Sequence, residues 1–480
     1  MRNTRIASNA TPPNSKWWAM LGIGLGVLMF TIDSSIVNIA LPTLVKAFET
    51  NFATIQLVVL SYLLVVTAFV LGAARLGDMY GKKKLYLSGL IIFTISSLLC
   101  GLSSSEYFLI AFRALQGMGA VFISALGAAI ITEVFPVSER GQALGIIGAI
   151  VSLGISLGPT VGGLLIGLSG WQSLFLVNVP IGIFASFIVL RFVPSSPSNS
   201  TRQRFDFLGA LLAIIALTCF AIGMTEGQKQ GFASPISLIL LALAAFFVVT
   251  FVFFESRLTQ PMLDLALFDN LQFSLSLLTA VFVFVVIAGI IFVLPFFLEL
   301  VLQRSTQQVG LLLAVSPVLG GIVAPISGRL SDHFGSRLIS LIGLLLMVIG
   351  CGLISTFDTQ LTDLGYILRV APFGLGIGMF QSPNNSAIMG GVPREKLGIA
   401  SGLLSLSRTL GQTAGVPLIG SLFSTIAIAA VKGTEKIDVT NAPPEALVQG
   451  LQGAFHVATF ILCGAVFVSA VVWWIELRGK

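Results

Sequence analysis

Long apolar blocks dominate this sequence and restrict it to one class of fold. Fourteen mostly apolar stretches follow one another between residues 17 and 475. Each is about 18 to 25 residues long, the length that a helix needs to cross a hydrocarbon core of about 30 Å. Of the 480 residues, 56% are hydrophobic and 10% are charged, whereas a soluble domain carries about 25% charged residues. The sequence therefore predicts an all-α polytopic membrane protein with fourteen transmembrane helices.

The positions of the basic residues predict the direction of the spans. With the N-terminus in the cytoplasm, most of the 26 Lys and Arg residues fall in cytoplasmic loops and termini, and the outward loops carry only Lys46, Lys229, Arg304, Lys432 and Lys436. Because cytoplasmic loops are enriched in Lys and Arg, we expect a protein of the inner (plasma) membrane with both termini in the cytoplasm. The same scatter of charges argues against a nucleic-acid partner, which would require a basic patch.

An internal repeat relates two parts of the chain. Asp78 has a counterpart 254 residues later in Asp332, and Arg113 has one 256 residues later in Arg369. Six residues recur at one offset of 257 positions, namely Pro136, Gly141, Gly145, Gly154, Gly158 and Gly163. Helix-packing glycines that recur by chance are the alternative, but six matches at one offset favour duplication. Parallel repeats of this kind place a substrate site between them near the middle of the bilayer.

The repeat also predicts the domain boundaries. Residues 1–193 and 273–480 are expected to form two pseudosymmetric six-helix bundles. Residues 194–272 are expected to form a linker and two inserted transmembrane helices, since Val193–Arg204 is rich in Pro, Ser and Asn.

Ionisable residues inside the spans are the first candidates for a role in transport, because such a group costs several kcal/mol unless it is paired or hydrated. Asp33 lies in the first span, and a poorly hydrated carboxyl group can bind and release protons near neutral pH. The alternative is a carboxylate held by packing hydrogen bonds with Asn38 or serines. Arg113, in the fourth span, is the second candidate for proton coupling, since its charge favours loss of a proton from a nearby acid. A static ion pair or a helix-end anchor is its alternative.

A glycine run in the fifth span predicts a helix that can bend or slide. Gly154, Gly158, Gly162 and Gly163 allow close approach of neighbouring backbones, and Pro159 removes a helix hydrogen bond. We assign these residues a conformational role, with packing alone as the alternative.

The turn after the second span predicts another gating element. Gly81 permits a compact reversal of the chain. Asp78 can cap a helix N-terminus or pair with a cation of the other half, which would latch the cytoplasmic side. Lys83 and the repeat-related Asp332 belong to the same prediction. The alternative is a topology determinant whose lysines keep the loop inside.

Three further residues are candidates for contact with a substrate or a cation. They are Asn38 in the first span and Glu226 and Glu299 near the outer ends of the seventh and ninth spans. Simple solvation is the alternative for the two acids. The two histidines lack the spacing of metal ligands, and the nucleotide-binding signature Gly-x-x-x-x-Gly-Lys-Ser/Thr is missing. We therefore expect no metal, no cofactor and no enzymatic activity, with a proton gradient as the energy source.

These motifs together resemble the Major Facilitator Superfamily, in its fourteen-span drug/proton antiporter branch. The resemblance covers nearly the whole chain. It rests on the segments Asp33–Pro42, Asp78–Lys84, Arg113–Gly119, Gly154–Gly163, Trp171–Pro180 and Asp206–Gly209. Two residues depart from the signature loop: Ala74 stands where Gly is usual, and Met79 stands where a basic residue is usual. We expect these departures to alter the latch.

The resemblance implies a proton-coupled antiporter that exports small lipophilic, often cationic compounds by alternating access. A dedicated exporter of one endogenous metabolite or lipid is the nearest alternative, and a non-transporting membrane sensor is a more distant one. The expected partners are a small amphiphilic substrate, protons and membrane lipid, with the chain acting as a monomer; an envelope adaptor protein stays open. The scarcity of acids in the spans argues against divalent cations as substrates.

Overall fold

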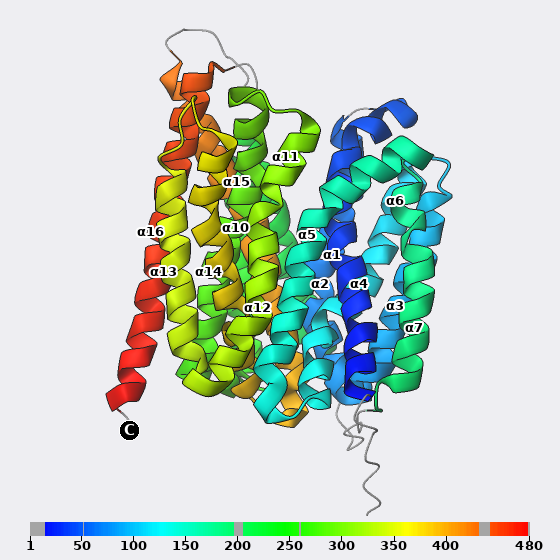
Figure 1. Ribbon diagram of the computed structural model, residues 1–480. Coiled ribbons are helices and arrows are strands. Elements are labelled where there is room, and N and C mark those ends of the chain that lie inside the picture. The colour runs from blue at the N-terminus through cyan, green and yellow to red at the C-terminus, as the bar shows by residue number, and fades with distance from the viewer. Residues whose placement is uncertain (1–14, 51, 196–204, 259–260, 432–441, 479–480) are drawn as a thin grey trace, which may run out of the picture.

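The computed structural model describes residues 15–50, 52–195, 205–258, 261–431 and 442–478, which form a bundle of long helices (Figure 1). The first half contains α1 (Ser15–Ala47), α2 (Phe52–Tyr80), α3 (Lys82–Gly101), α4 (Glu106–Val134), α5 (Arg140–Ser169), α6 (Ser173–Leu176) and α7 (Asn178–Phe192). The inserted pair is α8 (Phe207–Gln230) and α9 (Pro235–Glu255). The second half contains α10 (Leu271–Phe296), α11 (Thr306–Leu313), α12 (Val315–Phe334), α13 (Ser336–Ile354), α14 (Asp363–Gly390), α15 (Leu397–Ala430) and α16 (Pro444–Arg478).

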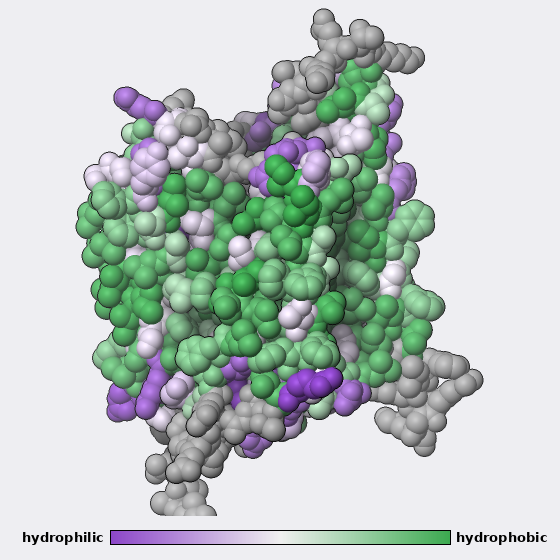
Figure 2. Space-filling view, turned by 180° about the vertical axis from the view of Figure 1, so that it is seen from behind, coloured by the Kyte–Doolittle hydropathy of each residue, from purple (hydrophilic) through white to green (hydrophobic). Residues whose placement is uncertain are grey.

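The apolar blocks of the sequence appear as membrane-spanning segments. Twelve helical segments in the described part of the chain are long and apolar enough to cross a membrane. The other two predicted spans correspond to α5 and α14, which are 30 and 28 residues long. Helix α14 buries polar residues such as Gln381 and Asn384, which lower its apolar content. Apolar side chains cover most of the face seen in Figure 2, between polar ends. The predicted all-α polytopic fold is therefore confirmed.

Prolines divide two of the predicted spans. The sixth span consists of α6, which ends at Leu176, and α7, which carries Pro180. The tenth span consists of α11, which ends at Leu313, and α12, which carries Pro317. In both cases the helix ends four residues before the proline, whose nitrogen has no hydrogen to donate to that carbonyl. The breaks therefore recur at similar places in the two halves.

Short glycine turns also recur. Gly81 links α2 to α3 with a φ of 98°, and Gly335 links α12 to α13 with a φ of 88°. Each donates its backbone N–H to the carbonyl four residues earlier, Gly77 or Ser331, at 3.0 Å. A side chain at either position would be strained in this left-handed conformation, so the two turns depend on glycine.

Two seams join the halves. One lies between α5 and α12, and the other lies between α2 and α15, with α4 also against α15. The inserted helix α8 packs on α2 and α15, so it covers the second seam, and α9 packs mainly on α8. The start of α1 and the end of α16 lie at the same end of the bundle (Figure 1), which we call the termini end.

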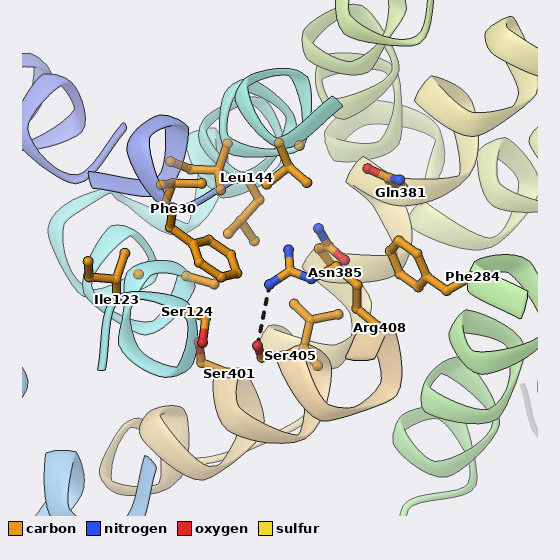
Figure 3. A pocket seen from close by; sticks show the side chains of 17 residues that line it. Phe30, Ile123, Ser124, Leu144, Phe284, Gln381, Asn385, Ser401, Ser405 and Arg408 are labelled. Atoms are coloured by element: carbon orange, nitrogen blue, oxygen red, sulfur yellow. Dashed lines mark hydrogen bonds between the residues drawn. The ribbon is translucent and has the colours of Figure 1, made fainter. Parts of the chain in front are cut away.

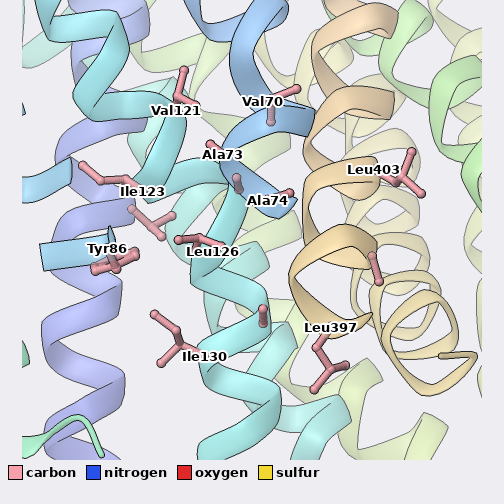
Figure 4. Close-up of a cluster of buried hydrophobic side chains, with 14 of the residues drawn as sticks. Val70, Ala73, Ala74, Tyr86, Val121, Ile123, Leu126, Ile130, Leu397 and Leu403 are labelled. Atoms are coloured by element: carbon pink, nitrogen blue, oxygen red, sulfur yellow. The ribbon is translucent and has the colours of Figure 1, made fainter. Parts of the chain in front are cut away.

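Apolar residues seal the second seam near the termini end. Leu397 and Leu403 of α15 belong to the same buried cluster as Ala74 of α2 and Ile130 of α4 (Figure 4). Since this cluster runs from one half into the other, the halves are closed against each other at that end.

Candidate functional site

A buried polar cluster surrounds Asp33 in the middle of the first half. Asp33 is 0% exposed and Arg113 is 1% exposed. Arg113 Nη1 lies 2.6 Å from Asp33 Oδ2, Gln116 Nε2 donates to Asp33 Oδ1 at 3.0 Å, and Asn178 Nδ2 donates to Oδ1 at 3.2 Å. Gln116 also accepts from Arg113 Nη1 at 2.6 Å. The two residues predicted to couple protons are thus brought together, and the carboxylate accepts hydrogen bonds from three side chains.

Local helix geometry explains how these side chains meet. Arg113 and Gln116 are three residues apart on α4, so they share one face of the helix. The break before α7 places Asn178 at the first position of that helix. Asp33 projects from α1, which packs against both α4 and α7. The cluster therefore ties together three helices of one half.

Aromatic groups enclose the Arg113 guanidinium. Its Cζ atom lies 4.2 Å from the centre of the Tyr62 ring and 5.8 Å from that of Phe175. Its Nε donates to the carbonyl of Val58 at 3.2 Å. A cation over an aromatic face is stabilised electrostatically, and more so away from water. The charge of Arg113 is therefore held in place from several sides.

At the termini end, Asp78 holds the start of a helix from the other half. Its two carboxylate oxygens accept the backbone N–H groups of Gly398 and Ile399, each at 2.9 Å. These groups begin α15, where the helix dipole favours negative charge. Lys82 pairs with Asp78 at 2.9 Å and with Glu133 at 2.8 Å. The second seam is thus closed by a buried carboxylate that is also held by a lysine.

Asp332 makes the repeat-related contact at the first seam. Its Oδ1 accepts the backbone N–H of Gly141, at the start of α5, at 3.2 Å. Ser382 donates its hydroxyl to the Gly141 carbonyl at 3.0 Å, and Arg329 donates to Gln142 at 3.1 Å. Each half therefore uses one aspartate to hold a helix start of the other half.

The glycine run of α5 packs on α1. A Cβ atom built on Gly154 would lie 2.8 Å from Thr31 Cβ, and one built on Gly158 would lie 2.8 Å from Ser35 Cβ. Gly162 is buried and Gly163 is exposed, whereas the side chain of Pro159 lies outside the described part of the structure. Helix α5 therefore touches α1 through these glycines and α12 through its start.

A central cavity lies between the halves (Figure 3). It encloses about 610 Å³, part of it open to solvent, and is lined by residues of α1, α4, α5, α10, α14 and α15. Phe30, Ile147 and Phe284 are among its apolar walls, and Gln381 and Arg408 are among its polar groups. Phe30 lies three residues before Asp33 on α1, so the cavity and the buried cluster share a helix.

Several predicted residues lie elsewhere. Glu226 accepts a hydrogen bond from Gln230 at 2.8 Å, and Glu299 is exposed; neither lines the central cavity. Lys83 donates to the Leu190 carbonyl at 2.9 Å, within its own half. The side chain of Asn38 lies outside the described part of the structure. The structure thus separates Glu226, Glu299 and Lys83 from the polar cluster around Asp33.

The departures from the signature loop have local explanations. The Cβ atom of Ala74 faces Gly402 of α15. Because Gly402 has no side chain, the methyl group of Ala74 fits between α2 and α15. Met79 is 7% exposed and belongs to the buried apolar residues, while Lys82 supplies the cation beside Asp78.

Comparison with known proteins agrees with this architecture. The family model described as Major Facilitator Superfamily matches residues 23–416 and 276–479. The chain belongs to the Major Facilitator Superfamily. The two matches overlap over residues 276–416, in the second half.

Relatives of this superfamily member carry transporter names. The chain is 37% identical to the riboflavin transporter RibZ of Clostridioides difficile over 85% of this chain and 88% of that one. It is 34% identical to the multidrug resistance protein Stp of Mycobacterium tuberculosis (strain CDC 1551 / Oshkosh) over 84% and 75%. The solved human organic anion transporter MFSD10 superposes with a TM-score of 0.67 at 17% identity, covering 96% of this chain and 100% of that one, which shows the shared fold alone. The resemblance to a drug-efflux branch is confirmed, and the chain is a multi-pass membrane transporter.

Sequence reasoning missed four residues of these sites. Gln116 and Asn178 were part of recognised motifs but had no assigned role; a polar residue one helical turn from Arg113 is a usable signal. Glu133 pairs across helices with Lys82, which no local pattern reveals. Arg408 was visible as a cation within a span, and such residues are functional candidates by default.

Proposed function

We propose that this superfamily member is a proton-coupled antiporter that exports small amphiphilic molecules by alternating access. The observation that carries the proposal is the buried pair of Asp33 and Arg113 with Gln116 and Asn178. An ionisable pair enclosed within a span is costly and marks ion or proton pathways. Asp33 lies three residues from Phe30, which lines the cavity, and this proximity supports a proton site beside a substrate route through the cavity.

The geometry supports a specific sequence of events. A proton that binds Asp33 removes the negative charge that attracts Arg113, so the contacts between α1, α4 and α7 weaken. Helix α1 packs on α5, which begins at the seam with α12. A shift of α1 therefore reaches the contact between Gly141 and Asp332, and this contact must open for substrate to enter from the termini end.

We infer from the positive-inside pattern that the protein lies in the inner (plasma) membrane with the termini end toward the cytoplasm. The described state is then closed on its cytoplasmic side. A proton that moves inward through 100 mV supplies about 2.3 kcal/mol, and each pH unit supplies about 1.4 kcal/mol. One or two protons per cycle suffice for accumulation, without nucleotide hydrolysis.

A dedicated metabolite exporter is a second candidate, favoured by the relative named as a riboflavin transporter at 37% identity. Both candidates use the same cavity and proton site. They differ in substrate range, so a panel of substrates separates them.

The test is uptake into inside-out vesicles that carry an imposed proton gradient. Two fluorescent compounds, rhodamine 6G and riboflavin, are compared for the native chain, Asp33→Asn and Asp358→Asn. Asp358 is exposed and accepts a hydrogen bond from the Gln360 backbone at 2.9 Å, so its variant is the matched control. We expect uptake by the native chain and the control, and loss of uptake in Asp33→Asn and after addition of a protonophore.

Uptake of riboflavin alone identifies the dedicated exporter. Uptake that persists in Asp33→Asn and in the presence of protonophore contradicts proton coupling through this site.

A further inference from the structure

Arg408 of α15 carries a positive charge in the wall of the central cavity (Figure 3). Within the described part of the chain, its polar partner is the Ser405 hydroxyl, 3.3 Å from Nη2, and its Cζ lies 5.7 Å from the centre of the Phe30 ring. A guanidinium has five N–H donors. Most of its capacity to donate is therefore left for a group inside the cavity.

Two other arginines of the described chain pair with a carboxylate instead. Arg113 pairs with Asp33 at 2.6 Å, and Arg304 pairs with Asp363 at 2.8 Å. Among the residues that line the cavity, Arg408 is the one ionisable group. A cation inside a membrane protein normally finds a carboxylate or carbonyl groups, so the cavity has a net positive charge without a counter-ion from the described chain.

The polar neighbours of Arg408 lie on the same face of α15. Ser401, Ser405 and Arg408 follow a spacing of four and three residues, which aligns them along one side of a helix. Ser401 is 1% exposed, lines the cavity, and its hydroxyl has no hydrogen-bond partner among the described residues. A buried hydroxyl without a partner is rare, and here it faces the same space as the free guanidinium donors.

Other parts of the cavity wall are apolar. Phe30, Ile147 and Phe284 line the same cavity as this polar strip, together with the uncharged polar residues Ser124, Gln381 and Asn385. A ligand that fits both surfaces has a negatively charged group at one end and an apolar body at the other. Guanidinium groups bind carboxylates and phosphates through paired hydrogen bonds.

We propose that Arg408, Ser405 and Ser401 form a subsite for the carboxylate or phosphate group of an amphiphilic organic anion. This rests on the proposed transport function and adds amphiphilic organic anions to the substrate classes that it covers. It also places the substrate near the proton site, because Tyr62 stacks on Arg113 at 4.2 Å and is close enough to Arg408 to interact with its charge.

The test compares two xanthene dyes of similar size and opposite charge, fluorescein and rhodamine 6G. Binding to the full chain in phosphatidylcholine nanodiscs is measured by fluorescence anisotropy at neutral pH. We expect the native chain to prefer fluorescein, and Arg408→Gln to weaken fluorescein binding by about tenfold or more, as for lost hydrogen bonds to a charged group. Arg408→Lys should fall between the two.

Arg369→Gln is the matched control, because Arg369 is a half-buried arginine of the same half that does not line the cavity and donates to the Thr356 carbonyl at 3.1 Å. It should bind fluorescein as the native chain does. A measurement on the native chain avoids any folding defect: octanoate should displace fluorescein, and octylamine should not. Native preference for rhodamine 6G, or equal fluorescein binding by folded Arg408→Gln, overturns the subsite.

Two further arms separate the possible outcomes. Displacement of fluorescein by added phosphatidylglycerol supports the subsite and identifies a lipid headgroup as its occupant; no displacement identifies a free organic anion. Asp33→Asn should retain fluorescein binding while it loses proton-driven transport. Fluorescein binding without any proton-driven transport in the native chain contradicts the proposed function alone, whereas proton-driven rhodamine 6G uptake without fluorescein binding contradicts the subsite alone.

Discussion

The two halves share a backbone plan but differ in how they use charge. Arg113 in the first half is buried against Asp33, whereas its counterpart Arg369 is half-buried and donates to a backbone carbonyl. Asp78 is buried between two backbone donors and Lys82, whereas Asp332 is exposed. Duplication therefore preserves turns and helix starts, while the buried ion pairs lie in the first half. We infer that the first half carries the proton chemistry and the second half carries the charge that meets the substrate.

The strongest way to break this comparison is to remove one arginine at a time. Arg113→Gln leaves Asp33 buried without its cation, which costs about 3–5 kcal/mol for pairs of this kind. Arg369→Gln removes a half-buried group that donates to one backbone carbonyl, and should cost only about 0.5–1.5 kcal/mol. Denaturation of each variant in mild detergent measures both effects.

The double variant Asp33→Asn/Arg113→Gln is the control for the pair. It should recover part of the loss, because no buried charge is left unpaired. Equal destabilisation by Arg113→Gln and Arg369→Gln would remove the distinction between the halves.

The next largest difference concerns the two aspartate latches. Asp78→Asn weakens the cap at the start of α15, and such a cap contributes up to about 2 kcal/mol. It also removes a favourable interaction with the α15 dipole, which contributes up to about 1 kcal/mol. Asp332→Asn should have a smaller effect, since that carboxylate is solvated. Spin labels at Val137→Cys and Phe334→Cys, both exposed on opposite halves at the termini end, report opening as a longer distance.

The four native cysteines are replaced first for this measurement. More opening in Asp332→Asn than in Asp78→Asn would show that the first seam, not the second, controls the closed state.

The sequence predicted the shared plan better than the differences. Apolar block length was sufficient for the long helices, Gly81 for the turn between α2 and α3, and the rule that ionisable groups are rare inside spans singled out Asp33 and Arg113, although not their pairing. Pairing across seams depends on distances between residues far apart in the chain, as between Asp78 and Gly398, and no local pattern encodes these. The free charge of Arg408 could not be recognised either, because a sequence shows that a cation is present but not that its neighbours lack a carboxylate.

The two seams also differ in how tightly their backbones approach. At the first seam, a Cβ atom built on Gly328 would lie 2.7 Å from the carbonyl carbon of Gly141. At the second seam the repeat-related residue is Ala74, which already has a Cβ atom, and this atom faces Gly402. Gly328→Ala should therefore separate α5 from α12 and destabilise the closed state. Overpacking costs about 1–3 kcal/mol, and we expect a value in the lower part of this range. Ala74→Gly should leave the second seam closed.

Spin-label distances between Val137 and Phe334 measure this effect too, with Gly352→Ala as the control, because nothing lies within 4 Å of a Cβ atom there. An unchanged distance in Gly328→Ala would mean that the first seam tolerates a side chain as the second does.

The smallest expected effect lies outside the two seams, where the inserted segment meets the second half. Asp264 pairs with Lys396, and the hydrogen bond from Lys396 lowers the pKa of the Asp264 carboxyl group below its ordinary value. A lowered pKa in the folded state means that the pair stabilises the protein above the unfolded pKa of about 3.9, and that this contribution disappears as pH falls through the lower, folded value. Since both side chains are 36% exposed, we expect less than about 1 kcal/mol.

Asp264→Asn should lower the free energy of unfolding slightly at pH 7, and not at all at a pH below the folded-state pKa of Asp264. Asp269→Asn is the control, because Asp269 is an exposed acid of the same turn. The measurement is the free energy of unfolding of both variants and of the native chain, from pH 7 down to a pH below that pKa. A loss of stability in Asp264→Asn as large as that in Asp78→Asn would contradict this expectation. It would show that the inserted segment is held to the second half as firmly as the halves are held to each other, so that the Asp78 contact would no longer dominate.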